Sequence, residues 1–305
     1  MQTLDSPAAL AALRQVTHIY TDLDGTMFAP GGRMLTNHKG EPSLQLAEAL
    51  VRLRQRGIEV IITTGRDVSS CTEIMRLANF DQFIGEMGCV TQYGYGENAQ
   101  KHYNLGEWPP EFTGQDDSNS NGDASMTPFE RISQSEALAA FLDHFKGRIE
   151  ELTFRHNREV THLLWGNVDT SPEGEVEQFF AQHEPPLQMY DNGIVHPKKH
   201  GLTDVSEVHI YNLVPRGSGK GEAVAADMAK KGLAPEQVLA IGDSKGDLPM
   251  GKHTGSFVLV TTPDDASLYG LAEAAVAHPE NLFATTLPTA DGWVEFANAL
   301  LKAQE

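Results

Sequence analysis

The sequence has little cysteine, no long apolar run and few cations, and each shortage argues against a class of protein. Its 305 residues include two cysteines, Cys71 and Cys89, without a CxxC pair, which favours a reducing, cytoplasmic compartment over a disulfide framework. No run approaches the ~18 apolar residues of a membrane span, and the amino-terminal residues show no signal-peptide pattern. Because 42 acidic residues accompany only 23 basic ones, for a formal net charge of −19, we expect neither nucleic acid nor an anionic membrane as a partner.

What the sequence does contain is the pattern of an α/β fold. Its apolar fraction of 40% and charged fraction of 21% are those of an ordinary globular protein, and 305 residues suit two domains. Short apolar runs, rich in β-branched residues and without polar alternation, predict buried parallel strands over 18–22, 58–65 and 238–243, and weaker runs predict strands at 256–261 and 274–278. Apolar residues at helical spacing predict helices over 43–57, 221–232 and near 291–303. The alternation predicts a doubly wound, mostly parallel, Rossmann-like sheet.

The middle of the chain has a different order of elements. Residues 106–128 are rich in polar residues, Gly and Pro and predict a loop or insertion, and Ser133 with Glu136 forms a capping-box pattern ahead of a helix to about Lys146. The elements predicted after it are strands at 151–157 and 159–166, a helix at 172–183, and strands at 187–193 and 204–213. This order predicts an inserted α+β domain of residues 94–208 between the two pieces of a core, residues 1–93 and 209–305.

Candidate functional residues gather where the predicted parallel strands end or beside them. They are Asp22, Asp24, Thr64, Gly65, Lys220, Asp243 and Asp247. The carboxyl ends of parallel strands form the functional edge of an open α/β sheet, so these residues are expected in one cleft. Four carboxylates cannot all stay ionised there without cations, which Lys220 and Mg²⁺ would supply. His and Cys are not clustered with zinc-like spacing, which disfavours zinc.

Four short motifs in these positions resemble those of the haloacid dehalogenase superfamily of phosphatases. They are "DLDGT" at 22–26, "ITTGR" at 62–66, Lys220 in "RGSGKGEA", and "IGDSKGDLPM" at 241–250, in the order of the family. The insertion between the second and third motifs is similar to the α+β cap, type IIB, of the Cof-type and sucrose-phosphatase-like branch. The resemblance implies a Mg²⁺-dependent phosphatase for a small phosphorylated metabolite, with a sugar phosphate as the best guess, acting as a monomer or small homo-oligomer.

The resemblance also implies a role for each residue. Asp22 would attack phosphorus, and Asp24 would protonate the leaving oxygen and then deprotonate water, which requires a pKa above the usual ~3.9 of an aspartate. The metal ligands would be the Asp22 carboxylate, the Asp24 carbonyl and Asp243, with Asp247 completing the acidic site. Thr64 and Gly65 would hold phosphate oxygens, and Lys220 would balance charge. Arg66 would contact either phosphate or an acidic neighbour.

Alternatives and departures accompany this interpretation. A phosphosugar mutase would share the nucleophile, and a non-catalytic binding protein could share the fold. "RGSGKGE" is not a nucleotide P-loop, because Val214 and Gly221 break the GxxxxGK[ST] pattern. Relatives of this branch usually carry Asn where this chain has Gly246, and commonly Asn-Gly-Ala where it reads "EMGC" at 86–89. Basic segments at 153–158 and 196–200 would hold a sugar or second anion, or be solvated.

Overall fold

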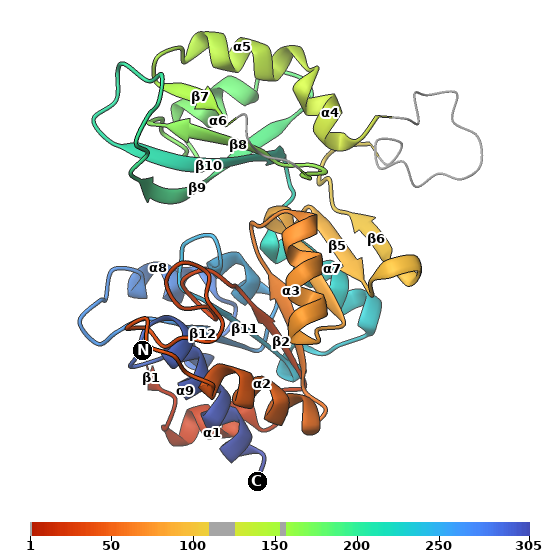
Figure 1. Ribbon diagram of the computed structural model, residues 1–305, viewed down its shortest axis with the longest axis vertical. Coiled ribbons are helices and arrows are strands. Elements are labelled where there is room, and N and C mark those ends of the chain that lie inside the picture. Colours follow the sequence, from red (N-terminus) through yellow and green to blue (C-terminus); the bar gives the residue numbers. More distant parts are fainter. Residues whose placement is uncertain (1, 110–125, 153–156) are drawn as a thin grey trace.

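The computed structural model describes residues 2–109, 126–152 and 157–305, and they form two stacked parts (Figure 1). The larger part is built on a nine-stranded sheet, whose strands are parallel from β1 through β4 and antiparallel from β4 to β6. Across the sheet the strands are β1 (Gln2–Thr3), β13 (Leu282–Ala284), β12 (Ser256–Leu259), β11 (Val238–Gly242), β2 (His18–Thr21), β3 (Glu59–Thr63), β4 (Gln82–Gly85), β5 (Val90–Tyr93) and β6 (Gln100–Tyr103). This arrangement confirms the predicted α/β class.

Helices cover both faces of this sheet. One group is α1 (Pro7–Leu13), α2 (Gln45–Gln55), α3 (Val68–Ala78) and α9 (Thr289–Ala303), and the other is α7 (Lys220–Lys231) and α8 (Tyr269–Ala275). Successive residues of β2 enter different apolar clusters: Ile19 packs with the first group of helices and Tyr20 with the second. A strand buried on both faces shows such alternation of apolar contacts without polar alternation, which explains its continuous hydrophobic sequence.

The smaller part, which comprises residues 126–152 and 157–215, is a four-stranded antiparallel sheet with helices on one side. The strand order is β7 (Ile149–Glu151), β8 (His162–Gly166), β10 (Val208–Pro215) and β9 (Leu187–Val195). The helices α4 (Pro128–Ser133), α5 (Glu136–His144) and α6 (Glu175–Phe180) lie mainly on the side remote from the larger part (Figure 1). Phe141 and Phe180 stack at 4.8 Å in its core. The open face of the sheet is therefore turned toward the larger part.

Two predictions of local structure are wrong, a strand at 274–278 and a capping box at Ser133 and Glu136. Residues 274–278 are not a strand: α8 continues to Ala275, and the strand of this region is β13. A short apolar run does not distinguish a strand from a helix end. The capping box lies at Thr127 and Glu130, which exchange side-chain and backbone hydrogen bonds, whereas α5 is capped by Ser135 alone. Of the strand predicted at 151–157, only Glu151 lies in a strand, at the end of β7, while residues 153–156 lie outside the described residues.

The two sheets also divide the chain differently from the predicted boundary of 94–208. β6 pairs with β5 and extends the larger sheet, while β10 pairs with β8 and β9 in the smaller sheet. The order of the predicted elements assigned the strand at 204–213 to the inserted domain, although the predicted boundary at 208 divides that strand. β6 was not placed, because partner choice in a sheet depends on residues far apart in the sequence. Of the predicted insertion at 106–128, residues 110–125 lie outside the described part. Among residues 2–109, 126–152 and 157–305, none of the helices has the length and hydropathy needed to cross a bilayer.

Candidate active site

Asp22 follows β2 directly and is fixed between the backbone of β11 and a buried cation. Its backbone N–H donates to the Ile241 carbonyl at 3.0 Å, and its carboxylate is 9% exposed. The ammonium of Lys220, at the first position of α7, donates to Asp22 Oδ1 at 2.7 Å and to Asp247 Oδ1 at 2.6 Å. The third and fourth sequence motifs thus converge on the first, as the sequence analysis predicts.

Three carboxylates form a compact group here, which we call the carboxylate cluster: Asp22, Asp243 and Asp247. One oxygen of each lies within 4.8 Å of the others. Asp243 accepts a hydrogen bond from Thr26 at 2.5 Å. Asp247 is fully buried and accepts from the Ser244 hydroxyl at 2.6 Å and from the backbone N–H groups of Asp243 and Ser244. Thr26 and Ser244 were not predicted, although both lie inside the motifs quoted from the sequence.

The electrostatics of the carboxylate cluster favour a bound cation. Burial raises the pKa of Asp22 to about 8, with Lys220 opposing that rise and Asp247 and Asp243 adding to it. Burial, reinforced by Asp247, raises the pKa of Asp243 to about 7. Burial by itself would lower the pKa of Lys220, but Asp22 and Asp247 raise it above its ordinary value. Three carboxylates beside one ammonium leave excess negative charge, and their hard oxygen ligands fit Mg²⁺.

Asp24 lies outside this cluster, because its side chain pairs with Arg66. The guanidinium donates two hydrogen bonds to the carboxylate, Nε to Oδ2 at 2.7 Å and Nη2 to Oδ1 at 2.5 Å. The side chain of Asp24 is 52% exposed. Of the two interpretations of Arg66, the structure therefore shows the acidic neighbour. The side chain of Asp24 is not among the clustered carboxylates, and the sequence analysis expected only its carbonyl as a ligand.

A cavity of about 290 Å³, the Asp22 cavity, lies beside these residues. From the larger part it is lined by Asp22, Thr64, Gly65 and Lys220, so the structure brings the second motif next to Asp22 and Lys220. The Thr64 backbone N–H donates to Ile84 at 2.8 Å, which fixes the turn after β3, and its hydroxyl accepts from the Arg66 N–H at 3.3 Å. An alcohol and a cation beside a carboxylate make a suitable binding place for a phosphoryl group.

The sequence model of the haloacid dehalogenase-like hydrolases matches residues 19–105 and 123–266 of this chain. The chain belongs to this family. A phosphoglycolate phosphatase of Methanoculleus marisnigri is 22% identical over 245 residues, covering 79% of this chain and 82% of that protein. The chloroplastic endoribonuclease YBEY of Arabidopsis thaliana is 23% identical over 256 residues, but this match covers 77% of this chain and 39% of that protein. The solved sucrose-phosphatase of Synechocystis, with sucrose and phosphate, has a TM-score of 0.59 at 16% identity, covering 94% of this chain and 98% of that one, which shows the shared fold.

This haloacid dehalogenase-like hydrolase also lines the Asp22 cavity with residues of its smaller part. Arg158 lies in a basic segment noted in the sequence, and it donates to the Gly65 carbonyl at 3.1 Å. Asn192 and Asn212 were not predicted. Asn192 stands where β9 carries one extra residue against β10, followed by Gly193 at φ +93°. An Asn-Gly pair inside a strand signals such a bulge, and bulges often re-aim side chains at functional sites. No comparable signal marked Asn212.

The two sequence departures noted above, at Gly246 and in the segment 86–89, are neighbours in the structure. Met87, within "EMGC", lines the Asp22 cavity. A Cβ placed on Gly246 would lie 3.8 Å from the Met87 Cε atom, and one on Gly65 would lie 3.0 Å from its sulfur. The long thioether therefore fills space beside Gly246 and packs over Gly65. A glycine at 246 is consistent with this larger neighbour, because Met adapts to irregular gaps.

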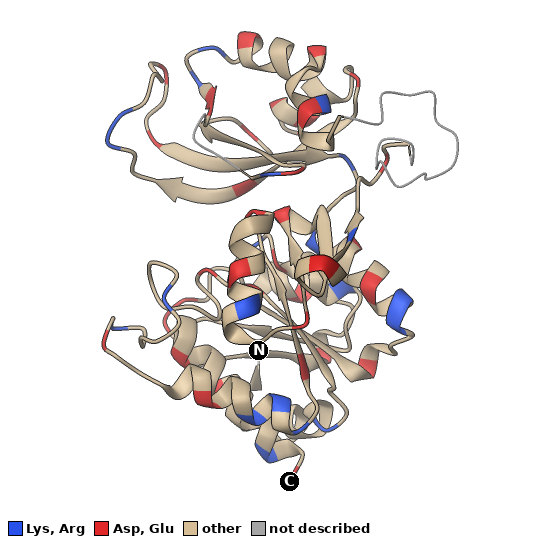
Figure 2. Ribbon diagram, turned by 45° about the vertical axis from the view of Figure 1, so that its right-hand side comes forward, with Lys and Arg blue, Asp and Glu red and all other residues tan. Residues whose placement is uncertain are grey.

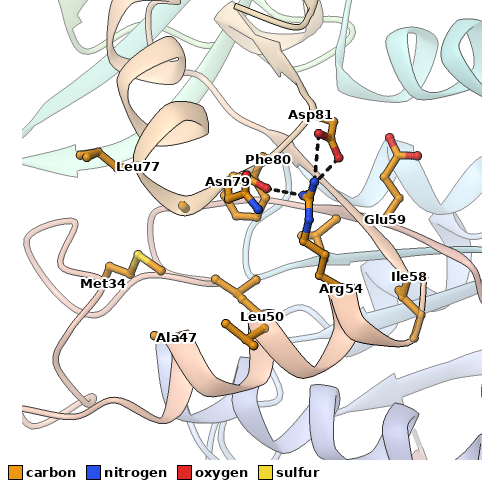
Figure 3. Close-up of a pocket in the computed structure, with 14 residues that line it drawn as sticks. Met34, Ala47, Leu50, Arg54, Ile58, Glu59, Leu77, Asn79, Phe80 and Asp81 are labelled. Carbon is orange, nitrogen blue, oxygen red and sulfur yellow. Dashed lines mark hydrogen bonds and ion pairs between the residues drawn. The ribbon is translucent and has the colours of Figure 1, made fainter.

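A larger cavity, of about 560 Å³, lies away from this site between α2 and α3 (Figure 3). Its walls are mainly apolar and include Leu50, Leu77 and Phe80. Its cation, Arg54, is paired with Asp81 at 3.1 Å and also donates to the Asn79 carbonyl. The carboxylate cluster does not border this cavity, so the size of the cavity is not evidence that it is the active site.

Proposed function

We propose that this chain is a Mg²⁺-dependent phosphatase that hydrolyses the phosphomonoester of a small metabolite, in particular a sugar phosphate. The observation that carries the proposal is the contact of Lys220 with both Asp22 and Asp247 beside Thr64 in one cavity. A buried carboxylate held by a cation, in a cavity that also presents the Thr64 hydroxyl, suits nucleophilic attack on phosphorus. The phosphatase names of two relatives support this chemistry.

The first step forms a bond between an Asp22 carboxylate oxygen and phosphorus while the bond from phosphorus to the leaving oxygen breaks. Asp24, which also lines the cavity, gives a proton that it has taken up from solvent to that oxygen. Arg66, which now holds Asp24, must release one of its two hydrogen bonds for the transfer. In the second step water attacks phosphorus, Asp24 takes the proton, and the Asp22 carboxylate is regenerated. In both steps Lys220 balances negative charge and Thr64 binds an oxygen atom of the phosphoryl group.

A cation would be held by Asp22, Asp243, Asp247 and the Asp24 carbonyl. Bound there, Mg²⁺ would neutralise charge on the phosphoryl oxygens. The smaller part would act as the cap of this enzyme. It contributes Arg158 and Asn212 to the cavity, so it excludes bulk water and selects the leaving group. We divide the enzyme accordingly into a core that ends at β6 and resumes after β10, with the cap between them.

The test is phosphate release from sugar phosphates and an aryl phosphate, with and without Mg²⁺, by the native chain and by Asp22→Asn. We expect release that requires Mg²⁺ and falls by about a thousandfold or more in the variant, because the amide is not a nucleophile. A rapid-quench experiment with labelled substrate should trap phosphate on the native chain only. Asp264→Asn, an exposed aspartate outside the cavity, is the matched control. Isomerisation of a sugar phosphate without net release would contradict the hydrolase assignment and indicate a mutase.

A further inference from the structure

The segment of chain that leads to Lys220 also joins the two parts of the molecule. Residues 216–219, which we call the lysine linker, run from the end of β10 in the smaller part to the first residue of α7 in the larger part. Ser218 in this linker is fully buried, and only Gly219 separates it from Lys220. The backbone around Ser218 therefore sets where α7 begins and where the side chain of Lys220 leaves the main chain.

Two side chains of the smaller part hold the carbonyl oxygen of Ser218. Gln188 Nε2 donates to this oxygen at 2.5 Å, and the hydroxyl of Tyr190 donates to it at 2.8 Å. Gln188 Nε2 also donates to the Tyr190 hydroxyl at 3.1 Å, so the three polar groups are joined. Burial, to which Glu222 and Cys89 add, raises the pKa of Tyr190, so the phenol keeps the proton that it donates. A buried carbonyl needs such donors, because leaving it unpaired is unfavourable.

The lysine linker has close neighbours in both parts of the molecule. A Cβ placed on Gly88 would lie 2.1 Å from the carbonyl oxygen of Gly219, and one placed on Gly219 would lie 2.7 Å from the hydroxyl oxygen of Tyr190. The linker thus lies against η1 (Glu86–Gly88) of the larger part and against β9 of the smaller part. A change in its contacts with β9 therefore changes the backbone that precedes Lys220.

Gln188 and Tyr190 are placed to act on the linker and not on a substrate. They occupy alternate positions of β9 and point to the linker, whereas Leu187 and Met189 between them are buried among apolar residues. Of the described residues of β9, Asn192 lines the Asp22 cavity, but Gln188 and Tyr190 do not. Their effect on the active site is therefore exerted through the main chain of the linker.

We propose that Gln188 and Tyr190 are positioning residues, which hold the ammonium of Lys220 in contact with the carboxylate cluster. They act through the Ser218 carbonyl, so the placement of the smaller part determines how well Lys220 balances charge in the active site. This inference rests on the proposed phosphatase function and adds to it two residues that lie outside the Asp22 cavity.

The experiment compares the native chain with Tyr190→Phe and with the double variant Gln188→Met/Tyr190→Phe. The kcat and KM for phosphate release from phenyl phosphate are measured with Mg²⁺. Misplacing a catalytic group by about 1 Å can lower the rate about a hundredfold. We expect kcat to fall about threefold or more in the single variant and about tenfold or more in the double variant, with KM changed by less than about twofold.

Hydrogen exchange measures the position of the linker without any substrate. The amide of Ser218 donates to Pro215 at 3.2 Å, and the amide of Ala223, in the first turn of α7, donates to Gly219 at 3.1 Å. Both amides should exchange faster in the single variant than in the native chain, and fastest in the double variant, because the linker has lost the donors that hold it.

Tyr211→Phe is the matched control, since it removes a tyrosine hydroxyl from the neighbouring strand β10. That hydroxyl accepts from the Val168 N–H at 3.2 Å and donates to the Val168 carbonyl at 3.3 Å, so its loss should change neither kcat nor exchange in the linker. Equal falls in kcat for Tyr190→Phe and Tyr211→Phe, or a higher KM at constant kcat, would overturn the positioning role while leaving the phosphatase intact.

If the native chain releases no phosphate from any ester, the proposed function fails instead, and hydrogen exchange alone decides. Faster exchange at Ser218 and Ala223 in the double variant supports the inference, and unchanged exchange refutes it.

Discussion

Lys220 shows how one residue serves both stability and chemistry. Its side chain is 5% exposed and neutralises two carboxylates, Asp22 and Asp247, that are themselves almost fully buried. Removing one partner of a buried ion pair leaves uncompensated charge, which typically lowers the free energy of unfolding by about 3–5 kcal/mol. We therefore predict a loss of this size for Lys220→Met in urea unfolding. The exposed Lys245→Met is the control and should change stability by less than about 0.5 kcal/mol; equal effects of the two variants would contradict the prediction.

The glycine of the first motif is required by its surroundings as well as its backbone. Gly25 has φ +89°, and a Cβ on it would lie 2.3 Å from Asp243 Oδ2. Gly57 also has a left-handed φ, +74°, but its Cβ would meet nothing within 4 Å. Gly57→Ala should therefore lower the free energy of unfolding by about 1–2 kcal/mol from backbone strain alone, and Gly25→Ala by more because Asp243 must also move.

Thermal unfolding of the two variants measures the difference in stability. Phosphate release tests whether moving Asp243 impairs the active site. We expect Gly57→Ala to retain activity and Gly25→Ala to lose most of it. Similar stability and activity in both variants would show that the close approach to Asp243 has no effect.

At the scale of elements, one buried carboxylate connects the two parts of the molecule. Glu86, after β4, accepts hydrogen bonds from the backbone N–H groups of Glu159, Val160 and Thr161 at 2.8–3.0 Å. It is fully buried and has φ +51°, a conformation that non-glycine residues rarely adopt. Strain of this kind persists where surrounding contacts maintain it. Arg158, which directly precedes this segment, lines the Asp22 cavity.

Glu86→Ala would leave two buried N–H groups and one partly buried N–H group without an acceptor, and we predict a loss of about 3 kcal/mol or more in the free energy of unfolding. Hydrogen exchange should become faster at the amides of residues 159–161 before the rest of the smaller part is affected. Glu97→Ala, at an exposed position, is the control. Unchanged protection of these three amides would show that Glu86 does not hold them.

A second connection joins β2, β3 and α7 and depends on pH. Burial would raise the pKa of Glu59, but His18 and Lys231, at 3.2 and 2.7 Å, lower it to about 2. A carboxyl whose pKa falls on folding stabilises the protein above its unfolded pKa of ~4.3, and this contribution disappears as pH falls through about 2. Because Glu59 is 30% exposed, solvent screening limits the gain to about 1–2 kcal/mol.

Urea unfolding of the native chain and Glu59→Gln over pH 2–7 tests this prediction. The difference in the free energy of unfolding should be largest above pH 5 and should vanish near pH 2, where both side chains are neutral. A difference that grows as the pH falls would have the wrong sign and would exclude this linkage.

At the scale of the whole molecule, acidic residues are spread over both parts (Figure 2), in keeping with the formal net charge of −19. This field attracts cations in general, but burial makes neutralisation of the carboxylate cluster the most stabilising. A cation that binds only the folded state raises stability by about 2.7 kcal/mol at a hundred times its Kd. We predict that millimolar Mg²⁺ raises the Tm of the native chain and raises that of Asp243→Asn far less.

Two controls separate binding at the carboxylate cluster from general screening of the surface charge. NaCl at the same ionic strength screens surface charges without binding the cluster, so it should raise the Tm less than Mg²⁺ does. Asp264→Asn, which removes an exposed charge, should respond to Mg²⁺ like the native chain. Equal effects of NaCl and Mg²⁺ would show that only general screening is at work.

The sequence by itself determined the α/β class and the grouping of Asp22, Thr64, Lys220, Asp243 and Asp247. Apolar runs and glycine-terminated helices are local patterns, and parallel strands necessarily bring their carboxyl ends to one edge, so motifs far apart in the chain could be placed together. Only the tertiary structure decided that β6 joins the larger sheet, that the whole of β10 belongs to the smaller one, and that Arg66 holds Asp24. It also decided that Asn212 lines the Asp22 cavity. Each of these depends on which distant partner packs or pairs with a residue, and that choice is made by the whole fold.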